Sequence, residues 1–206
     1  RLVRVDEPDS TGALPNLTNP AAGQKTEYGY DGNDNLTSVV QSEVQQDQSV
    51  VTQERKFKYD PLSRLVAEKQ VEATPTLTDA GVPGAPDPGK WTKVLKYNAD
   101  GLLEQGIDAR GVTTTFDYDG LNRIEEVIYS DGTPRVKYYY DQARTGFHNN
   151  GALTKVETIR ETSTPAEIFA TAAEFDYDLM GRLRKHRQWI NGQQYDLEYD
   201  YNLAGQ

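Results

Sequence analysis

The sequence has no cysteine among its 206 residues, which excludes disulfide bonds and thiolate catalysis and leaves the redox compartment open. It also has no run of about 18 apolar residues, so no transmembrane helix is predicted. The 22 basic residues are outnumbered by 32 acidic residues, which gives a net charge of −10. Because phosphate groups need a basic surface, this charge argues against binding to nucleic acid or to anionic membranes.

Apolar residues are scarce as well, at 36% of the chain. A compact globule of this length needs a sizeable apolar core, whereas a thin sheet with one wet face needs fewer apolar residues. The composition therefore favours a thin sheet.

A short aromatic motif occurs seven times: an aromatic residue or leucine, any residue, tyrosine, and then aspartate or asparagine. Its tyrosines are Tyr30, Tyr59, Tyr97, Tyr118, Tyr140, Tyr177 and Tyr201. Successive tyrosines lie 29, 38, 21, 22, 37 and 24 residues apart, so the long intervals look like the same repeat with insertions. Recurrence of this kind indicates a small supersecondary unit stacked many times, which builds scaffolds rather than compact enzymes.

Each repeat predicts a β-hairpin. Val112, Thr114, Phe116 and Tyr118 alternate with polar residues, and a period of two is typical of a strand with one apolar face. A turn follows the motif, and the next extended run ends in a second turn such as 131–132, whose Asp-Gly pair is a strong hairpin signal. No window has a convincing helical pattern. We therefore expect an all-β fold, a repetitive ribbon of antiparallel β-hairpins.

The turn sequence carries a specific resemblance. Residues 177–183 read Tyr-Asp-Leu-Met-Gly-Arg-Leu, and residues 59–65 and 118–124 match them with the glycine replaced. This pattern resembles the signature of the YD-repeat (Rhs) family, over roughly residues 25–206. Relatives include bacterial Rhs toxins, insecticidal toxin-complex shells and animal teneurins. The resemblance implies a long β-strip that spirals into a hollow shell, which encloses a toxic C-terminal domain or serves in extracellular adhesion.

The expected organisation is an array of about seven repeats over residues 25–206, the last one truncated. Residues 1–24 are an irregular lead-in or a partial repeat, and residues 74–90 are a Pro/Gly-rich insertion. The first residue is not Met, and the last copy stops inside its turn, so we expect a fragment of a longer chain. Open strand edges on such a fragment invite self-association.

Structural roles are predicted for the repeat aromatics and for the Asp and Arg of the turns. Each Arg lies four residues after its Asp, which favours an ion pair that closes the turn, or a guanidinium on a repeat tyrosine, over a row of ligand-binding arginines. Besides the seven tyrosines, the residues assigned to this scaffold are Phe57, Phe116, Phe175, Asp60, Asp119, Asp178, Arg64, Arg123 and Arg182.

Two pairs of acidic residues are candidates for a catalytic site. Asp117 with Asp119, and Asp176 with Asp178, have the spacing of two carboxylates on one strand face, as glycoside hydrolysis would require. However, Asp119 and Asp178 open turns, where an aspartate caps backbone N–H groups. The structural interpretation is therefore preferred.

Other site patterns are weak. Residues 31–35 resemble the start of a calcium loop, but Leu36 stands where such a loop needs glycine. His148 and His186 have no catalytic neighbour, and no nucleophile elbow, phosphate loop or zinc-protease motif is present. We expect no enzyme activity, cofactor or metal.

The resemblance to YD-repeat proteins therefore implies a non-catalytic structural segment of a shell in an exported bacterial protein, secreted or at the cell surface. Its partners would be the neighbouring repeats and a toxin or effector domain of the parent chain. The alternative is a cell-surface adhesion or carbohydrate-binding module. Tyr139, Trp189 or the Pro-rich loop would then make the contacts, because aromatic rings on a sheet suit sugar stacking.

Overall fold

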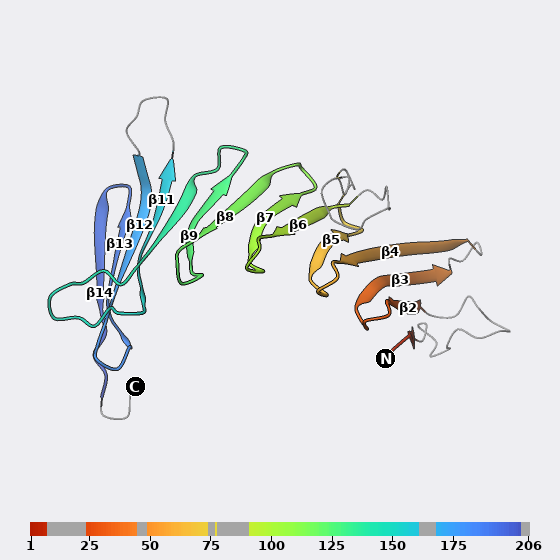
Figure 1. The fold of residues 1–206 in the computed structure, drawn as a ribbon, viewed down its shortest axis with the longest axis horizontal. Coiled ribbons are helices and arrows are strands. Elements are labelled where there is room, and N and C mark those ends of the chain that lie inside the picture. The colour runs from red at the N-terminus through yellow and green to blue at the C-terminus, as the bar shows by residue number, and fades with distance from the viewer. Residues whose placement is uncertain (8–23, 45–48, 74–76, 78–90, 161–167, 203–206) are drawn as a thin grey trace. The chain divides into compact units, whose positions relative to one another are not determined.

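The computed structural model describes residues 1–7, 24–44, 49–73, 77, 91–160 and 168–202. Over these residues the chain forms fourteen strands of one sheet and no helix, and the strands lie in sequence order (Figure 1). Strands that neighbour each other in the sequence pair antiparallel. The prediction of an all-β ribbon of hairpins is thus confirmed. No helix that could cross a membrane is found in this part of the chain.

The chain divides into two compact units. The first comprises residues 1–97 and 106–111, and the second residues 98–105 and 112–206. The first unit holds β1 (Arg4–Glu7), β2 (Gln24–Tyr30), β3 (Leu36–Val44), β4 (Val50–Tyr59), β5 (Leu65–Lys69) and β6 (Lys93–Tyr97). The strand β7 (Leu103–Asp108) has residues in both. The second unit holds β8 (Thr113–Tyr118), β9 (Ile124–Tyr129), β10 (Arg135–Tyr140), β11 (Leu153–Arg160), β12 (Ile168–Tyr177), β13 (Leu183–Ile190) and β14 (Gln193–Glu198).

Two predicted irregular segments lie largely outside the described residues. Residues 8–23 of the lead-in are not described, while Arg4–Glu7 forms strand β1 and pairs with β2. Of the insertion at 74–90 only Leu77 is described, and it forms an isolated bridge with Trp91.

The repeat tyrosine marks the end of a strand. Strands β2, β4, β6, β8, β10 and β12 all end at one, and the next strand begins after the turn. In five of these hairpins the strand register shifts just before the tyrosine, as between Asp117 and Tyr118. Such a bulge redirects a side chain, so the direction of the tyrosine side chain does not follow the regular alternation of its strand.

The sheet of the second unit has two different faces. On one face Phe116 lies opposite Val127, which lies opposite Val136, and Val127 is buried. Phe116 thus lies on the face that the sequence predicts to be apolar. The other face, here called the charged face, carries Lys137, Lys155, Glu157, Glu174, Arg187 and Asp196, which the strand register brings into line.

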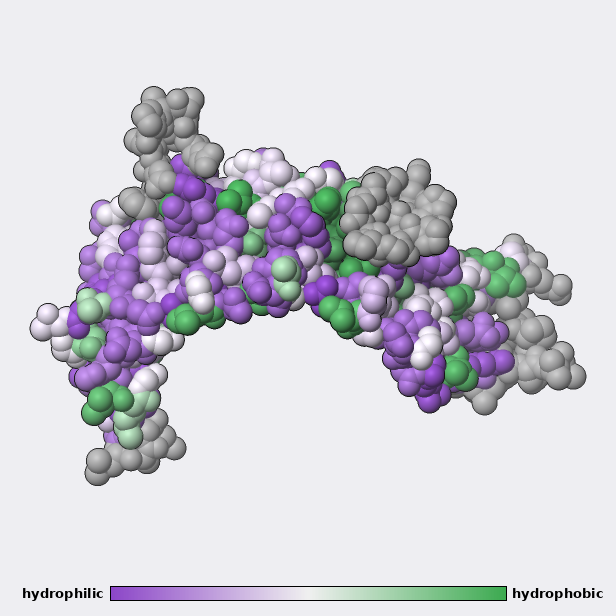
Figure 2. Space-filling model, viewed as in Figure 1, coloured by the Kyte–Doolittle hydropathy of each residue, from purple (hydrophilic) through white to green (hydrophobic). Residues whose placement is uncertain are grey.

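Little of the sheet is fully buried. Among the described residues the buried apolar side chains are Val66, Ala67, Trp91, Val127 and Ile159. Figure 2 shows that hydrophilic residues dominate the visible described surface. With so small an apolar core, polar contacts take a large share in fixing the side chains of the sheet.

Candidate functional site

The Asp of each complete repeat caps its own turn. Oδ1 of Asp119 accepts the backbone N–H groups of Leu121 and Arg123 at 2.9 and 3.0 Å, and Oδ2 accepts Nε–H of Arg123 at 2.7 Å. Asp60 and Asp178 make the same three contacts in their turns. The backbone N–H of Arg123, with help from its guanidinium, lowers the pKa of Asp119, so this carboxylate stays charged.

The fourth residue after the repeat tyrosine has a left-handed backbone. In Gly101 and Gly181 φ is 84° and 75°, and the substituted positions Asp34, Ser63 and Asn122 keep φ at 69°, 60° and 62°. The turn therefore imposes its conformation even where the glycine is replaced.

The Arg of the turn reaches the tyrosine of the next repeat. Its Cζ lies over that ring, at 4.5 Å from the centroid for Arg64 and Tyr97, 4.1 Å for Arg123 and Tyr140, and 4.3 Å for Arg182 and Tyr201. The ion pair with Asp and the cation–π contact, which the sequence offered as alternatives, thus coexist on one guanidinium.

The tyrosine hydroxyl returns a second contact. Tyr140 donates to the backbone carbonyl of Ile124 at 2.9 Å, directly after Arg123, whose guanidinium covers its ring. Six of the seven repeat tyrosines donate to a carbonyl in this way: Tyr30, Tyr97, Tyr118, Tyr140, Tyr177 and Tyr201. We call the joined Asp, Arg and next-repeat tyrosine, for example Asp119, Arg123 and Tyr140, the Asp–Arg–Tyr link.

Burial raises the pKa of most of these phenols, including Tyr97, Tyr118, Tyr140 and Tyr177. Their hydroxyls therefore stay protonated at neutral pH and remain able to donate. Sequence periodicity places the tyrosines, but it does not reveal their acceptors, which lie in another repeat.

One turn departs from the pattern. The turn after Tyr140 runs through residues 141–152, where Oδ1 of Asp141 accepts the backbone N–H of Gly151 and Oδ2 pairs with Arg123 at 2.8 Å. The longer loop leaves room for polar side chains that the other turns lack.

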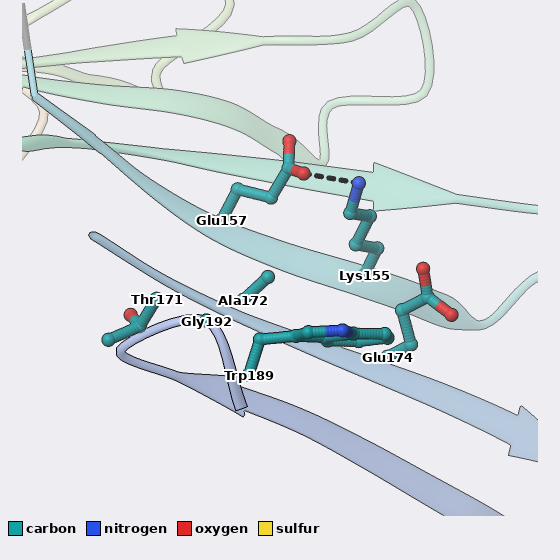
Figure 3. A pocket seen from close by; sticks show the side chains of 7 residues that line it. All are labelled: Lys155, Glu157, Thr171, Ala172, Glu174, Trp189 and Gly192. Carbon is teal, nitrogen blue, oxygen red and sulfur yellow. Dashed lines mark ion pairs between the residues drawn. The ribbon is translucent and has the colours of Figure 1, made fainter. Parts of the chain in front are cut away.

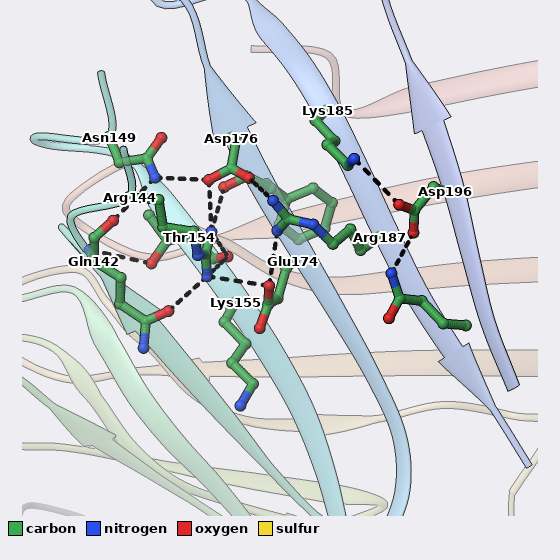
Figure 4. Close-up of polar contacts among 12 residues, drawn as sticks. Gln142, Arg144, Asn149, Thr154, Lys155, Glu174, Asp176, Lys185, Arg187 and Asp196 are labelled. Atoms are coloured by element: carbon green, nitrogen blue, oxygen red, sulfur yellow. Dashed lines mark hydrogen bonds and ion pairs between the residues drawn. The ribbon is translucent and has the colours of Figure 1, made fainter. Parts of the chain in front are cut away.

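These side chains converge on Asp176, which has no exposed surface (Figure 4). Its Oδ1 accepts Nη1 of Arg144 at 2.7 Å and Nδ2 of Asn149 at 2.9 Å, and its Oδ2 accepts Nη2 of Arg187 at 2.6 Å. Oδ1 of Asn149 in turn accepts the backbone N–H of Tyr177 at 3.0 Å. The long turn is thereby fastened to the end of β12.

The two acid pairs have unlike surroundings. Asp176 is enclosed by cations while Asp178 caps its own turn, and Asp117 is exposed while Asp119 caps its turn. Sequence reasoning weighed Asp176 only beside Asp178 and missed its partners. The available signal was the extended turn with its Arg and Asn.

The remaining candidates have local partners. The ring of His186 stacks on Phe175 with centroids 5.0 Å apart, and the backbone N–H of His148 donates to the carbonyl of Tyr177. Asp31 accepts the backbone N–H groups of Asn33 and Asn35, as a turn cap does. Within the described ranges no cluster of three or more acidic or histidine side chains could hold a metal ion.

A hollow of about 310 Å³ lies on the charged face next to the Asp176 cluster (Figure 3). Trp189 lies along it, and the Lys155–Glu157 ion pair lies opposite. Its lining residues include Lys155, Glu157, Thr171, Ala172, Glu174 and Trp189.

Comparison with known proteins agrees with this geometry. Residues 97–134 match the family model of the RHS repeat. A search of curated proteins found no match. The fold is similar to chains in three crystal structures: TcdB2-TccC3-Cdc42 (14% identity, TM-score 0.52, 97% of this chain), TcdB2-TccC3 (13%, 0.50, 95%) and TcdB2-TccC3 without its hypervariable C-terminal region (13%, 0.51, 97%).

This chain spans 10% of the length of each of those chains. The matched residues 97–134 contain two of the seven repeat tyrosines, and the same turn geometry recurs outside them. The family match over residues 97–134, the repeated sequence motif and the repeated turn support the resemblance of this chain to Rhs/YD-repeat proteins.

Proposed function

We propose that this chain is a non-catalytic segment of a shell wall, which encloses or presents a toxin or effector domain of a longer exported bacterial protein. The observation that carries the proposal is the Asp–Arg–Tyr link. At Arg64, Arg123 and Arg182 it joins the turn to the next repeat through a ring contact and a hydroxyl–carbonyl hydrogen bond. A link that recurs along the array suits a wall, because the same contacts fasten neighbouring repeats at several places.

The wall role assigns a function to the repeat residues. The tyrosines and phenylalanines supply the packed aromatic surface. In the three complete turns, the Asp fixes the backbone and the Arg, and the Arg contacts the next tyrosine. The partners are then the neighbouring repeats and the enclosed domain. The family resemblance supports secretion or display at the bacterial surface.

The chemistry of the acids supports a non-catalytic role. Both oxygens of Asp176 are bound by guanidinium or amide N–H groups, and those of Asp119 by its own turn. A general acid or nucleophile needs an oxygen that can reach a substrate. These carboxylates instead stabilise the fold by accepting hydrogen bonds within it.

The size of the native product tests the proposal. An antibody raised against this chain is used to probe source cells and medium, and the native protein is then treated with protease. We expect a band far above 23 kDa and an accompanying domain that resists proteolysis. Opening the wall with Tyr118→Ala should expose that domain. A native band near 23 kDa would overturn the proposal and favour a free-standing adhesion module.

A further inference from the structure

The hollow on the charged face results from one small residue. Ala172 of β12 lies opposite Glu157 of β11 and opposite Trp189 of β13. Glu157 and Trp189 are therefore two strand spacings apart, about 9.6 Å, with only a methyl group between them. The gap has the width of a single six-membered ring, and its volume of about 310 Å³ is at the lower end for ligand pockets.

Trp189 gives this hollow an aromatic wall. Its ring plane runs along the hollow rather than into the sheet (Figure 3). The indole N–H of Trp189 has no acceptor among the described residues. An aromatic plane with a spare donor at its edge suits a ligand that is apolar on one side and polar at its rim.

Carboxylates supply acceptors around that plane. One oxygen of Glu157 pairs with Lys155, and Oε2 of Glu174 accepts Nη1 of Arg187 at 2.9 Å. The second oxygen of each carboxylate has no partner in the described part of the chain. Two acceptors, an indole donor and a lysine therefore border one small space.

The charges around the hollow decide the kind of ligand. Three cations and three carboxylates lie beside the hollow in two groups, each without net charge: the Lys155–Glu157 pair, and the cluster of Arg144, Arg187, Glu174 and Asp176. The glutamates are already neutralised by Lys155, Arg144 and Arg187, so an amine ligand would add an uncompensated positive charge, and an anion would meet two glutamates. A neutral ligand rich in hydroxyl groups meets neither cost.

We propose that this hollow binds one neutral pyranose ring of a saccharide. The C–H face of the sugar stacks on Trp189, its hydroxyls donate to Glu157 and Glu174, and its oxygens accept from the indole N–H. This site is independent of the wall role. The wall role is tested by the native size of the protein, and sugar binding does not change that size.

Indole N–H signals in ¹H–¹⁵N NMR spectra test the proposal, because the chain has only two tryptophans. Trp91 is 4% exposed and serves as an internal control. Glucose, galactose, N-acetylglucosamine and their linear trisaccharides are titrated separately. We expect a saturable shift of the Trp189 signal for at least one sugar, with a dissociation constant on the order of millimolar, and no shift of Trp91.

Variants locate the effect. Ala172→Leu fills the hollow and should abolish the shift, whereas Gln188→Ala, next to Trp189 but on the other face, should keep it. If Ala172→Leu loses its amide spectrum, saturation-transfer difference NMR on the wild type replaces it, with saturation expected on the sugar ring protons.

Three outcomes would overturn the proposal. They are the absence of a saturable shift with every sugar, an equal shift in a folded Ala172→Leu variant, and a shift caused by hexylamine but by no sugar. The last would identify a cation site.

Discussion

At the scale of single residues, substitutions at the left-handed position of the turn measure the cost of backbone strain separately from that of side-chain packing. Ser63 has φ of 60°, where an L side chain is strained. Ser63→Gly should therefore raise the free energy of unfolding by about 0.5–1 kcal/mol, after the entropy cost of glycine is subtracted. Gly181→Ala should lower it by about 1 kcal/mol, since its φ is 75°.

Urea titration measures both changes, and Gly120→Ala is the matched control. Gly120 lies in a repeat turn without a positive φ, and an added Cβ there meets nothing within 4 Å. It should lose no stability. Equal losses at Gly120 and Gly181 would show that the left-handed conformation is not what matters.

The tyrosine hydroxyl of the Asp–Arg–Tyr link is testable by removal of one atom. Tyr140→Phe keeps the ring beneath Arg123 but deprives the carbonyl of Ile124 of its donor. The expected loss is about 1 kcal/mol, the usual net value of one hydrogen bond. Tyr195→Phe, at a tyrosine that is 56% exposed, should change little in the same urea titration. Equal losses of stability at Tyr140 and Tyr195 would show that the Tyr140 hydroxyl does not contribute to the link.

At the scale of elements, the long turn after β10 is held to β12 by Asp176. Asp176→Asn leaves Arg144 and Arg187 without their shared anion and should cost about 3 kcal/mol or more, as expected when one partner of a buried ion pair is removed. The equivalent residue of another repeat is Asp117, which is exposed. Asp117→Asn should stay within about 0.5 kcal/mol of the wild type in calorimetry or urea titration. A small loss at Asp176 would mean that the cluster contributes little.

The edge strand β14 predicts association of the 206-residue chain. It pairs only with β13 among the described strands, and its Tyr195 and Leu197 are 56% and 55% exposed. Unpaired strand edges recruit other strands. Light scattering should show a mass that rises with concentration, and Leu197→Lys should lower it. The exposed turn variant Leu121→Lys should not. A monomer at every concentration would contradict this prediction.

At the scale of the whole molecule, the fold should lose stability at both acidic and alkaline pH. The repeated turn aspartates are responsible at acidic pH, and the repeat tyrosines at alkaline pH. Hydrogen bonds from the turn backbone lower the pKa of Asp119 and Asp178. Their contribution is therefore complete above the unfolded pKa of about 3.9 and is lost as the pH falls through the lower folded values.

The phenols act in the opposite direction. Burial raises the pKa of Tyr118, Tyr140 and Tyr177, so their contribution is complete below the unfolded value of about 10 and is lost as the pH rises through the folded values. Circular dichroism and phenolate absorbance followed together should change in one transition. Phenols that titrate near pH 10 while the fold persists would argue against buried, donating hydroxyls.

The amino-acid sequence by itself determined the local structure. The period-two pattern of residues 112–118 specifies a strand and its apolar face, because side chains alternate across a sheet whatever lies beyond it. The Asp and Arg of the turn, four residues apart, predict an ion pair for the same reason, since both partners belong to one short segment.

Only the tertiary structure decided the contacts between segments. The acceptor of the Tyr140 hydroxyl, the two arginines on Asp176 and the hollow between Glu157 and Trp189 depend on strand register and on the path of one long turn. Each of these contacts joins residues at least 11 positions apart, and periodicity does not reveal which ones meet. The repeat thus follows from local chemistry, whereas the polar cluster and the candidate sugar site follow from how neighbouring hairpins align.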